Sequence, residues 1–465
     1  MNSHKTDATF LDRIIRARII NARTIESERF PAHRFLQRAI ATLSGSLFLG
    51  FSAALSFAHP QVAQAQTESV VYSFCAMSNC ADGSDPVGNL VLDGAGNLYG
   101  MTGSGGITGG VCQSYGCGTV FERTAAGTLQ TLYEFSGAPD GNNPMNGLLR
   151  DSTGNLYGTT AYGGNSGGVC GTIGCGIAFE LVKTGATYTE KVLYAFTGGA
   201  DGANPGSGLV RDTGGNLYGT TVTGGGSGCN AGTGCGTVFE ITSAGNEEVL
   251  HSFTGNADGA SPSASLILDA AGNLYGTTPH GGNLDGTCGS LGCGVVFKVT
   301  PAGQETVLYT FKAGADGQSP MAPLVRDGKG NFYGTTSTGG DVNNLWCRIQ
   351  QNGCGVVFEL TEKGVLRTLY AFKGYPKDGQ HPIAGVAFDK QGNLYGTTDW
   401  GGSSNDGAVF KLAPGGVETV LHGLTGGTDG ENPFGSVVLD AEGNLYGTAI
   451  YGGAFGDGVL FKVIP

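Results

Sequence analysis

Residues 271–300 read AGNLYGTTPHGGNLDGTCGSLGCGVVFKVT, and close variants of the GNLYGTT segment recur seven times in the chain of 465 residues. The asparagines of these seven copies are Asn97, Asn155, Asn216, Asn273, Asn331, Asn393 and Asn444. A regular spacing of roughly 50 to 60 residues, with several strands in each copy, is typical of propellers rather than of two-helix solenoids. The repeated segment therefore decides the architecture.

Each repeat contains four candidate strands, which in the third copy cover residues 208–212, 216–221, 236–242 and 248–253. The D-x-x-G-N sequence between the first two strands is typical of a tight turn. The chain has 86 glycines and only 14% charged residues, and no helical periodicity follows residue 65. We therefore predict an all-β fold, a seven-bladed β-propeller of four-stranded blades.

The two chain ends are out of phase with the repeat. Residues 70–74, VVYSF, match the fourth strand of the other repeats, whereas the chain ends just after GVLFKV, which matches a third strand. An open array would leave exposed sheet edges. We therefore predict that the N-terminal strand completes the last blade and closes the ring.

Residues 1–65 have the features of a signal peptide with a long basic n-region. Seven arginines precede an apolar run at residues 40–58, and small residues at Ala63 and Ala65 form an A-x-A cleavage site. An uncleaved anchor is the alternative, because 19 apolar residues can just span a bilayer. With cleavage, residues 66–465 form one exported propeller domain, periplasmic or extracellular, with no membrane span.

The charge of the exported part limits its partners. Residues 66–465 hold 17 basic and 34 acidic side chains, a net charge of −17. Such a surface repels nucleic acid, whereas neutral glycans, cationic groups and proteins remain suitable ligands. We expect a monomer.

All 12 cysteines lie in the exported part and form six close pairs. Five pairs fall between the second and third strands of successive repeats, and the sixth follows residues 70–74. Paired cysteines in an exported chain favour local disulfides, whereas zinc sites need four converging ligands. The predicted disulfides are Cys75 with Cys80, Cys112 with Cys117, Cys170 with Cys175, Cys229 with Cys235, Cys288 with Cys293, and Cys347 with Cys354.

The most informative positions for function are those at which the repeats differ. Just before the GG that follows GTT, the repeats carry Ser104, Tyr162, Thr223, His280, Thr338, Trp400 and Tyr451. The links between blades carry a D-G-x-x-P sequence, and both sets should lie on the face of the disulfide loops. Our candidate ligand-binding residues are Tyr162, His280, Trp400, Tyr451, Asp140, Asp201, Asp258, Asp316, Asp378 and Asp429.

These aspartates have a simpler interpretation, because Asp-Gly with a following proline is typical turn chemistry. Calcium held by several of the carboxylates is an alternative, since hard oxygen ligands suit that ion. We otherwise expect no cofactor and no metal.

The sequence contains no H-E-x-x-H and no G-x-x-x-x-G-K motif, and we assign no catalytic residues. We therefore expect a non-catalytic binding or scaffold propeller. The alternative is a lyase or glycan hydrolase acting at the acidic loop face, with acid–base groups drawn from His280, His381, Glu431 and Arg348.

The segments GNLYGTT, GG, CG-x-VFE and VLY-x-F-x-G-x-x-DG-x-x-P over about residues 70–465 resemble the GloVer tandem repeats of bacterial exported, choice-of-anchor proteins. The resemblance implies a propeller-like fold and export, and it supplies no catalytic residues. No apolar segment follows Lys462, so we expect a soluble exported form rather than an anchored one.

Overall fold

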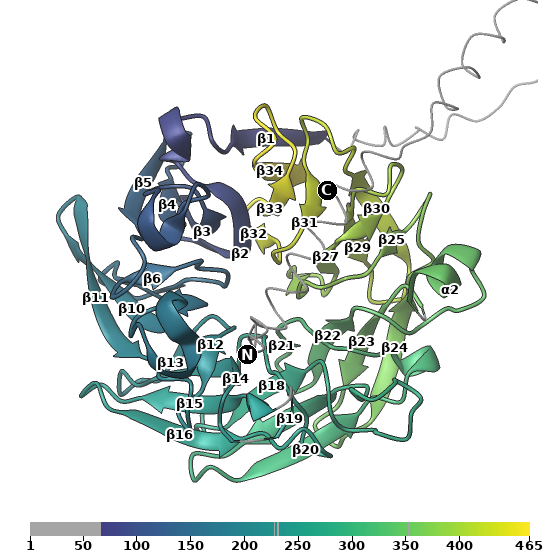
Figure 1. Ribbon diagram of the computed structural model, residues 1–465. Helices are drawn as coiled ribbons and strands as arrows, with labels where there is room; N and C mark the ends of the chain where they lie inside the picture. The colour runs from purple at the N-terminus through teal and green to yellow at the C-terminus, as the bar shows by residue number, and fades with distance from the viewer. Residues whose placement is uncertain (1–66, 227, 230–231, 352) are drawn as a thin grey trace, which may run out of the picture. The chain divides into compact units, whose positions relative to one another are not determined.

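The computed structural model describes residues 67–226, 228–229, 232–351 and 353–465, and the predicted signal segment lies outside these ranges. Seven main antiparallel sheets stand as blades around a common centre (Figure 1). The prediction of an all-β propeller with seven four-stranded blades is confirmed. One short α-helix, α2 (Leu345–Gln351), projects from the loop between the second and third strands of the fifth blade.

The first four blades follow one another along the chain. Blade 1 contains β2 (Ser84–Leu92), β3 (Leu98–Ser104), β4 (Thr119–Arg123) and β5 (Leu129–Glu134). Blade 2 contains β7 (Leu149–Arg150), β8 (Leu156–Thr160), β10 (Ile177–Thr184) and β11 (Thr187–Ala195), beside the paired β6 (Gly141–Asn142) and β9 (Tyr162–Gly163). Blade 3 contains β12 (Ala203–Pro205), β13 (Val210–Arg211), β14 (Leu217–Thr223), β15 (Thr237–Ile241) and β16 (Glu247–Ser252). Blade 4 contains β17 (Ile267–Leu268), β18 (Leu274–Thr278), β19 (Val295–Val299) and β20 (Glu305–Thr310).

The last three blades complete the ring. Blade 5 contains β21 (Val325–Arg326), β22 (Phe332–Thr336), β23 (Val356–Leu360) and β24 (Leu366–Ala371). Blade 6 contains β26 (Ala387–Phe388), β27 (Leu394–Thr398), β29 (Ala408–Leu412) and β30 (Glu418–Gly423), beside the paired β25 (Gly379–Gln380) and β28 (Trp400–Gly401). Blade 7 contains β31 (Glu431–Pro433), β32 (Val438–Leu439), β33 (Leu445–Tyr451), β34 (Val459–Ile464) and β1 (Thr67–Ser73).

The N-terminal strand closes the ring as predicted. Strand β1 pairs antiparallel with β34, from Thr67 opposite Ile464 to Ser73 opposite Val459 (Figure 1). The predicted bounds were too narrow at one end, because the strand begins at Thr67 rather than at residue 70. Its first three residues are polar, so an apolar pattern does not reveal them. Phe74 follows the strand and donates its backbone N–H to the Gly458 carbonyl at 2.9 Å.

The glycine of NLYGTT is required by the third strand of the same blade. In the fourth repeat a Cβ on Gly276 would lie 2.7 Å from the ring of Phe297, and the other six repeats have equivalent approaches of 2.5–2.8 Å. The tyrosine and asparagine hold the preceding turn, where Tyr275 and Asn273 both donate to Asp269 at 3.0 and 2.9 Å. The interpretation of D-x-x-G-N as turn chemistry is thus confirmed.

The hydrophobic core is divided into seven clusters, and each lies at the seam between two blades. At six seams, the phenylalanine after one blade's fourth strand packs on the third-strand phenylalanine of the next blade. Phe135 and Phe179 are one such pair, and the six centroid distances are 5.0–5.4 Å. At the remaining seam Leu424 packs with Phe461. Every blade is therefore stabilised mainly by its neighbours.

Candidate functional site

The positions at which the repeats differ come together at the start of each blade. The D-G-x-x-P segments lead into the first strand position, which lies at the centre of the ring (Figure 1). Each residue before GG pairs across the sheet with a residue of that segment. The pairs are Ser84 with Ser104, Asn142 with Tyr162, Ala203 with Thr223, Ala260 with His280, Gln318 with Thr338, Gln380 with Trp400, and Glu431 with Tyr451. We call these seven pairs the central ring.

In six of the seven repeats, the second threonine of the motif fixes the backbone of the central ring, whereas the seventh has Ala449 there. The threonine hydroxyl donates to the carbonyl of the residue two positions later, as in Thr160 to Tyr162 at 2.6 Å and Thr398 to Trp400 at 2.8 Å. The first glycine after the ring residue has a positive φ, and in blade 6 a Cβ on Gly401 would lie 2.4 Å from a backbone oxygen. The same scaffold therefore presents serine, threonine, tyrosine, histidine or tryptophan, depending on the blade.

Blade 6 gives the central ring its most elaborate arrangement. The rings of His381 and Trp400 stack with centroids 4.8 Å apart and an angle of 17° between their planes. Nδ1 of His381 lies 3.3 Å from Oδ2 of Asp399, and both side chains are buried. The backbone carbonyl of Asp399 accepts a hydrogen bond from the Asn432 side chain of blade 7 at 2.9 Å. These contacts orient the imidazole and the indole together.

The aspartates of the D-G-x-x-P segments act within their own turns. Asp140 accepts hydrogen bonds from the hydroxyl of Tyr133 and from the backbone and hydroxyl of Ser136, at 2.8–3.2 Å. Tyrosines hold Asp82, Asp201, Asp316 and Asp378 in the same way. His251 and His422 take the tyrosine's place beside Asp258 and Asp429, at 3.6 and 3.1 Å. The contact with the aspartate explains why a histidine can stand in these two fourth strands where the other repeats have tyrosine. The sequence alone gives these histidines no chemical role.

The disulfide loops lie beside the links between blades. All six predicted disulfides are present, each within its own loop. A Cβ on Gly198, in the link after blade 2, would lie 2.7 and 2.9 Å from the sulfur atoms of Cys175 and Cys170. The same closeness recurs at Gly255 and Gly374. The loops and links therefore share one face, as the strand order requires.

The residues considered for acid–base chemistry lie on four different blades. His280 is on blade 4, Arg348 on α2 of blade 5, His381 on blade 6 and Glu431 on blade 7. Burial lowers the pKa of His280 to about 4, so this side chain is neutral at pH 7. The imidazole of His280 therefore contributes a ring surface rather than a positive charge.

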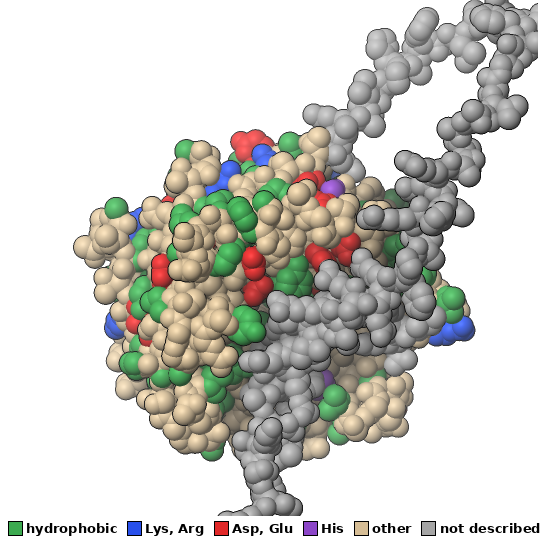
Figure 2. Space-filling view, turned by 45° about the horizontal axis from the view of Figure 1, so that its top comes forward, with side chains coloured by type: hydrophobic (Ala, Val, Ile, Leu, Met, Phe, Trp, Pro, Cys, Tyr) green, Lys and Arg blue, Asp and Glu red, His purple; other side chains and the backbone are tan. Residues whose placement is uncertain are grey.

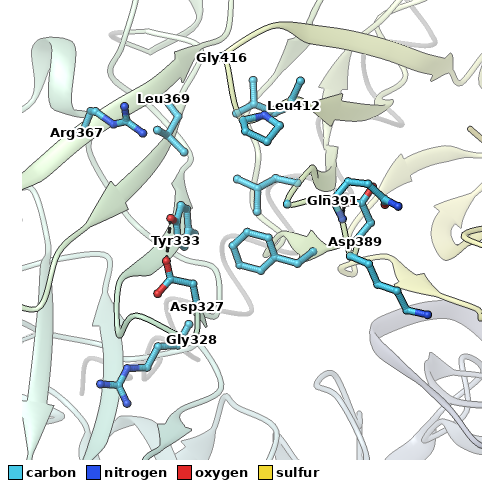
Figure 3. A pocket seen from close by; sticks show the side chains of 16 residues that line it. Asp327, Gly328, Tyr333, Arg367, Leu369, Asp389, Gln391, Leu412 and Gly416 are labelled. Carbon is cyan, nitrogen blue, oxygen red and sulfur yellow. Dashed lines mark hydrogen bonds between the residues drawn. The ribbon is translucent and has the colours of Figure 1, made fainter.

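A pocket of 590 Å³ lies at the opposite end of the seam between blades 5 and 6 (Figure 3). Tyr333 and Leu369 of blade 5 face Phe388 and Leu412 of blade 6, and the ring centroids of Tyr333 and Phe388 are 5.0 Å apart. Its two arginines already pair with glutamates of blade 5, Arg326 with Glu362 and Arg367 with Glu359. Sequence reasoning missed this pocket, although one signal was present. Phe388 lies at the position of the repeat at which three other blades have arginine.

In the part of the surface visible in Figure 2, acidic side chains stand at several separate places among apolar and neutral groups. Within the described residues, no helix has the length and apolar character to cross a membrane.

Solved structures similar to the chain were found. A selenomethionine-substituted virginiamycin B lyase from Staphylococcus aureus has 13% identity with the chain, and the match covers 86% of this chain and 99% of that one, with a TM-score of 0.52. A luciferin-regenerating enzyme has 10% identity, with coverage of 86% and 95% and a TM-score of 0.39. At such identities the likeness concerns the fold alone. The comparison with curated proteins gave no significant match.

A family model of the Gloeobacter/Verrucomicrobia repeat matches residues 37–233, 169–345 and 347–465. The matches cover all seven copies of the GNLYGTT segment, which the structure shows to be the second strand of each blade. The chain therefore belongs to the Gloeobacter/Verrucomicrobia repeat family.

Proposed function

We propose that the protein is an exported, non-catalytic propeller that binds an extracytoplasmic glycan or protein segment at the central ring. One observation carries this proposal: seven equivalent positions on one scaffold hold seven different cross-strand pairs. The NLYGTT segment that supports these positions is by contrast nearly the same in every repeat. Variation at one ring of positions on a repeated scaffold is a pattern expected of a binding site on a propeller.

The residue types in the central ring favour a neutral ligand with flat faces. Tyr162, His280, Trp400 and Tyr451 offer ring surfaces on which sugars or aromatic side chains can stack. Asn142 and Gln380 add amide donors and acceptors from the partner strand. The net charge of −17 in residues 66–465 disfavours a polyanion. Six disulfides fit an oxidising compartment outside the cytoplasm.

A lyase or glycan hydrolase is the second candidate, and the pair of His381 and Asp399 is the observation that favours it. A histidine held by an aspartate is the usual arrangement of a general base. The fold itself is compatible with both functions.

The test uses the two tryptophans of the chain. Trp346→Phe leaves Trp400 as the only tryptophan, so a ligand at the central ring should change its fluorescence. The exported chain is first screened on glycan and peptidoglycan arrays, with product analysis of each hit. We expect binding without released product, weakened at least tenfold by Tyr451→Ala and unchanged by Tyr115→Ala, which alters an exposed disulfide loop. Released product would refute the non-catalytic role. Unchanged Trp400 fluorescence would refute the proposed site.

A further inference from the structure

Five seams between blades contain a glutamate that the proposed function does not use. The aspartate of each D-G-x-x-P segment is called the link aspartate below. The fourth strand of blades 2, 3, 4, 6 and 7 carries a glutamate four residues before the tyrosine or histidine that binds the link aspartate. These glutamates are Glu190, Glu247, Glu305, Glu418 and Glu68. In blades 1 and 5 the same position is Leu129 and Leu366.

The strand register shows where these side chains point. Glu190 lies opposite Leu181, and residues directly opposite in an antiparallel pair share one face of the sheet. Leu181 is fully buried in the cluster between blades 1 and 2, so Glu190 also faces blade 1. The other four glutamates lie opposite Ile241, Val299, Leu412 and Val463, each buried against the preceding blade. All five carboxyl groups therefore point into a seam.

Each glutamate meets the link aspartate of the preceding blade. Glu190 faces Asp140 and Tyr133, Glu247 faces Asp201 and Tyr194, and Glu418 faces Asp378 and Tyr370. Glu305 and Glu68 face His251 with Asp258 and His422 with Asp429. Two further charges act on single seams, Glu248 beside Glu247 and Lys373 beside Glu418.

One oxygen of every glutamate is buried without a hydrogen-bond partner. This is Oε1 in Glu68, Glu190, Glu247, Glu305 and Glu418 alike. In Tyr133, Tyr194 and Tyr370 the hydroxyl donates its proton to the aspartate. The hydroxyls of Tyr194 and Tyr370 also lie within hydrogen-bonding range of Glu247 and Glu418, but one hydroxyl proton cannot serve two carboxylates fully. An ionised glutamate would bring a second negative charge beside the first. A neutral carboxyl group instead supplies the missing proton, which it can donate to the aspartate or to the tyrosine oxygen.

We propose that these five glutamates form a pH-sensitive set of contacts between blades, closed when each carboxyl group is neutral and loosened when it ionises. Burial and the neighbouring aspartate raise the pKa of Glu190 and Glu247 to about 7. The same causes raise the pKa of Glu418 to about 7. For these three glutamates, a raised pKa means that the stabilisation is complete below about pH 4.5 and is lost as the pH rises through about 7. The pKa values of Glu305 and Glu68 are raised in the same direction, chiefly by burial. Glu68 lies on β1, so the strand that closes the ring also belongs to the set, at the seam between blades 6 and 7.

The main test compares the melting temperature at pH 5 and pH 8. The wild-type chain should melt several degrees lower at pH 8. A chain with Glu→Gln at all five positions should lose less than half as much, because glutamine cannot ionise. The single variants Glu190→Gln and Glu442→Gln remove the same charge, but Glu442 is exposed in a turn. Only Glu190→Gln should reduce the pH dependence. Equal pH dependence in these two single variants would overturn the proposal.

Two further measurements do not depend on the stability of the fivefold variant. In the wild-type chain at pH 6, infrared spectra should show a carboxylic-acid band that Glu190→Gln weakens and Glu442→Gln does not. Leu366→Glu should add a glutamate to the seam between blades 4 and 5, beside Asp316, and increase the pH dependence of melting. The proposal would be refuted if the carboxylic-acid band were unchanged in all five single Glu→Gln variants. It would also be refuted if the melting temperature of the Leu366→Glu chain had the same pH dependence as that of the wild-type chain.

Discussion

Removal of β1 should open the ring at blade 7. A chain that starts at Cys75 loses the whole ladder between β1 and β34, which runs from Thr67 opposite Ile464 to Ser73 opposite Val459. It also loses Phe74, which is fully buried and packs on Phe121 with ring centroids 5.1 Å apart. Removal of a buried phenylalanine side chain costs about 3–5 kcal/mol, and each strand hydrogen bond contributes about 1 kcal/mol. The expected loss is on the order of 5–10 kcal/mol.

The assay is a thermal melt of three chains that start at Thr67, at Val70 and at Cys75. We expect a graded fall in melting temperature, since residues 67–69 already pair with β34. Phe74→Ala in the longest chain should reproduce much of the loss, whereas Phe455→Ala should not, because Phe455 is 55% exposed. Equal melting temperatures for the chains that start at Thr67 and Cys75 would refute the argument that β1 holds the ring closed.

Three other predictions concern single features. In a urea melt, Gly158→Ala should destabilise the chain by about 1–3 kcal/mol, because the new Cβ would lie 2.6 Å from the Phe179 ring. The control Gly94→Ala should be neutral, since its Cβ would have no atom within 4 Å. Non-reducing peptide mapping should find all six disulfides within their own loops, and reduction should cost about 2 kcal/mol for each loop; links between blades would contradict this. Addition of calcium after chelation should leave the melting temperature unchanged, because the link aspartates already accept hydrogen bonds, and a rise would reveal a cation site.

The repeat made the fold predictable, because the period of the repeat and its phase at the chain ends can both be read from the amino-acid sequence. Four strands per repeat and the mismatch at the chain ends were enough to predict seven blades and their closure. The start of β1 was missed because Thr67, Glu68 and Ser69 are polar. A signal existed all the same: Glu68 stands four residues before Tyr72, as Glu418 stands four residues before His422.

The place of the varying positions within each blade was predictable from the repeat, but their contacts were not. The positions before GG indicated where the blades differ, and the structure brings them into one ring. The stacking of His381 on Trp400 depends on the pairing of Gln380 with Trp400, and a cross-strand register is not written in the spacing of residues. The link aspartates could be assigned to turns from Asp-Gly and proline, but their tyrosine and histidine partners lie seven to ten residues earlier in the chain.

The repeated motif also shows why function must be sought outside it. In NLYGTT the asparagine and tyrosine hold a turn, the glycine makes room for a phenylalanine, and the second threonine fixes the next backbone carbonyl. The first threonine links neighbouring blades, since Thr277 donates to the Ala322 carbonyl of the next blade at 3.1 Å. Each of these side chains is already used within the fold, and none is left to bind a ligand. A propeller built from copies of one repeat can therefore acquire ligand specificity only where the copies differ, at the central ring and in the loops around it.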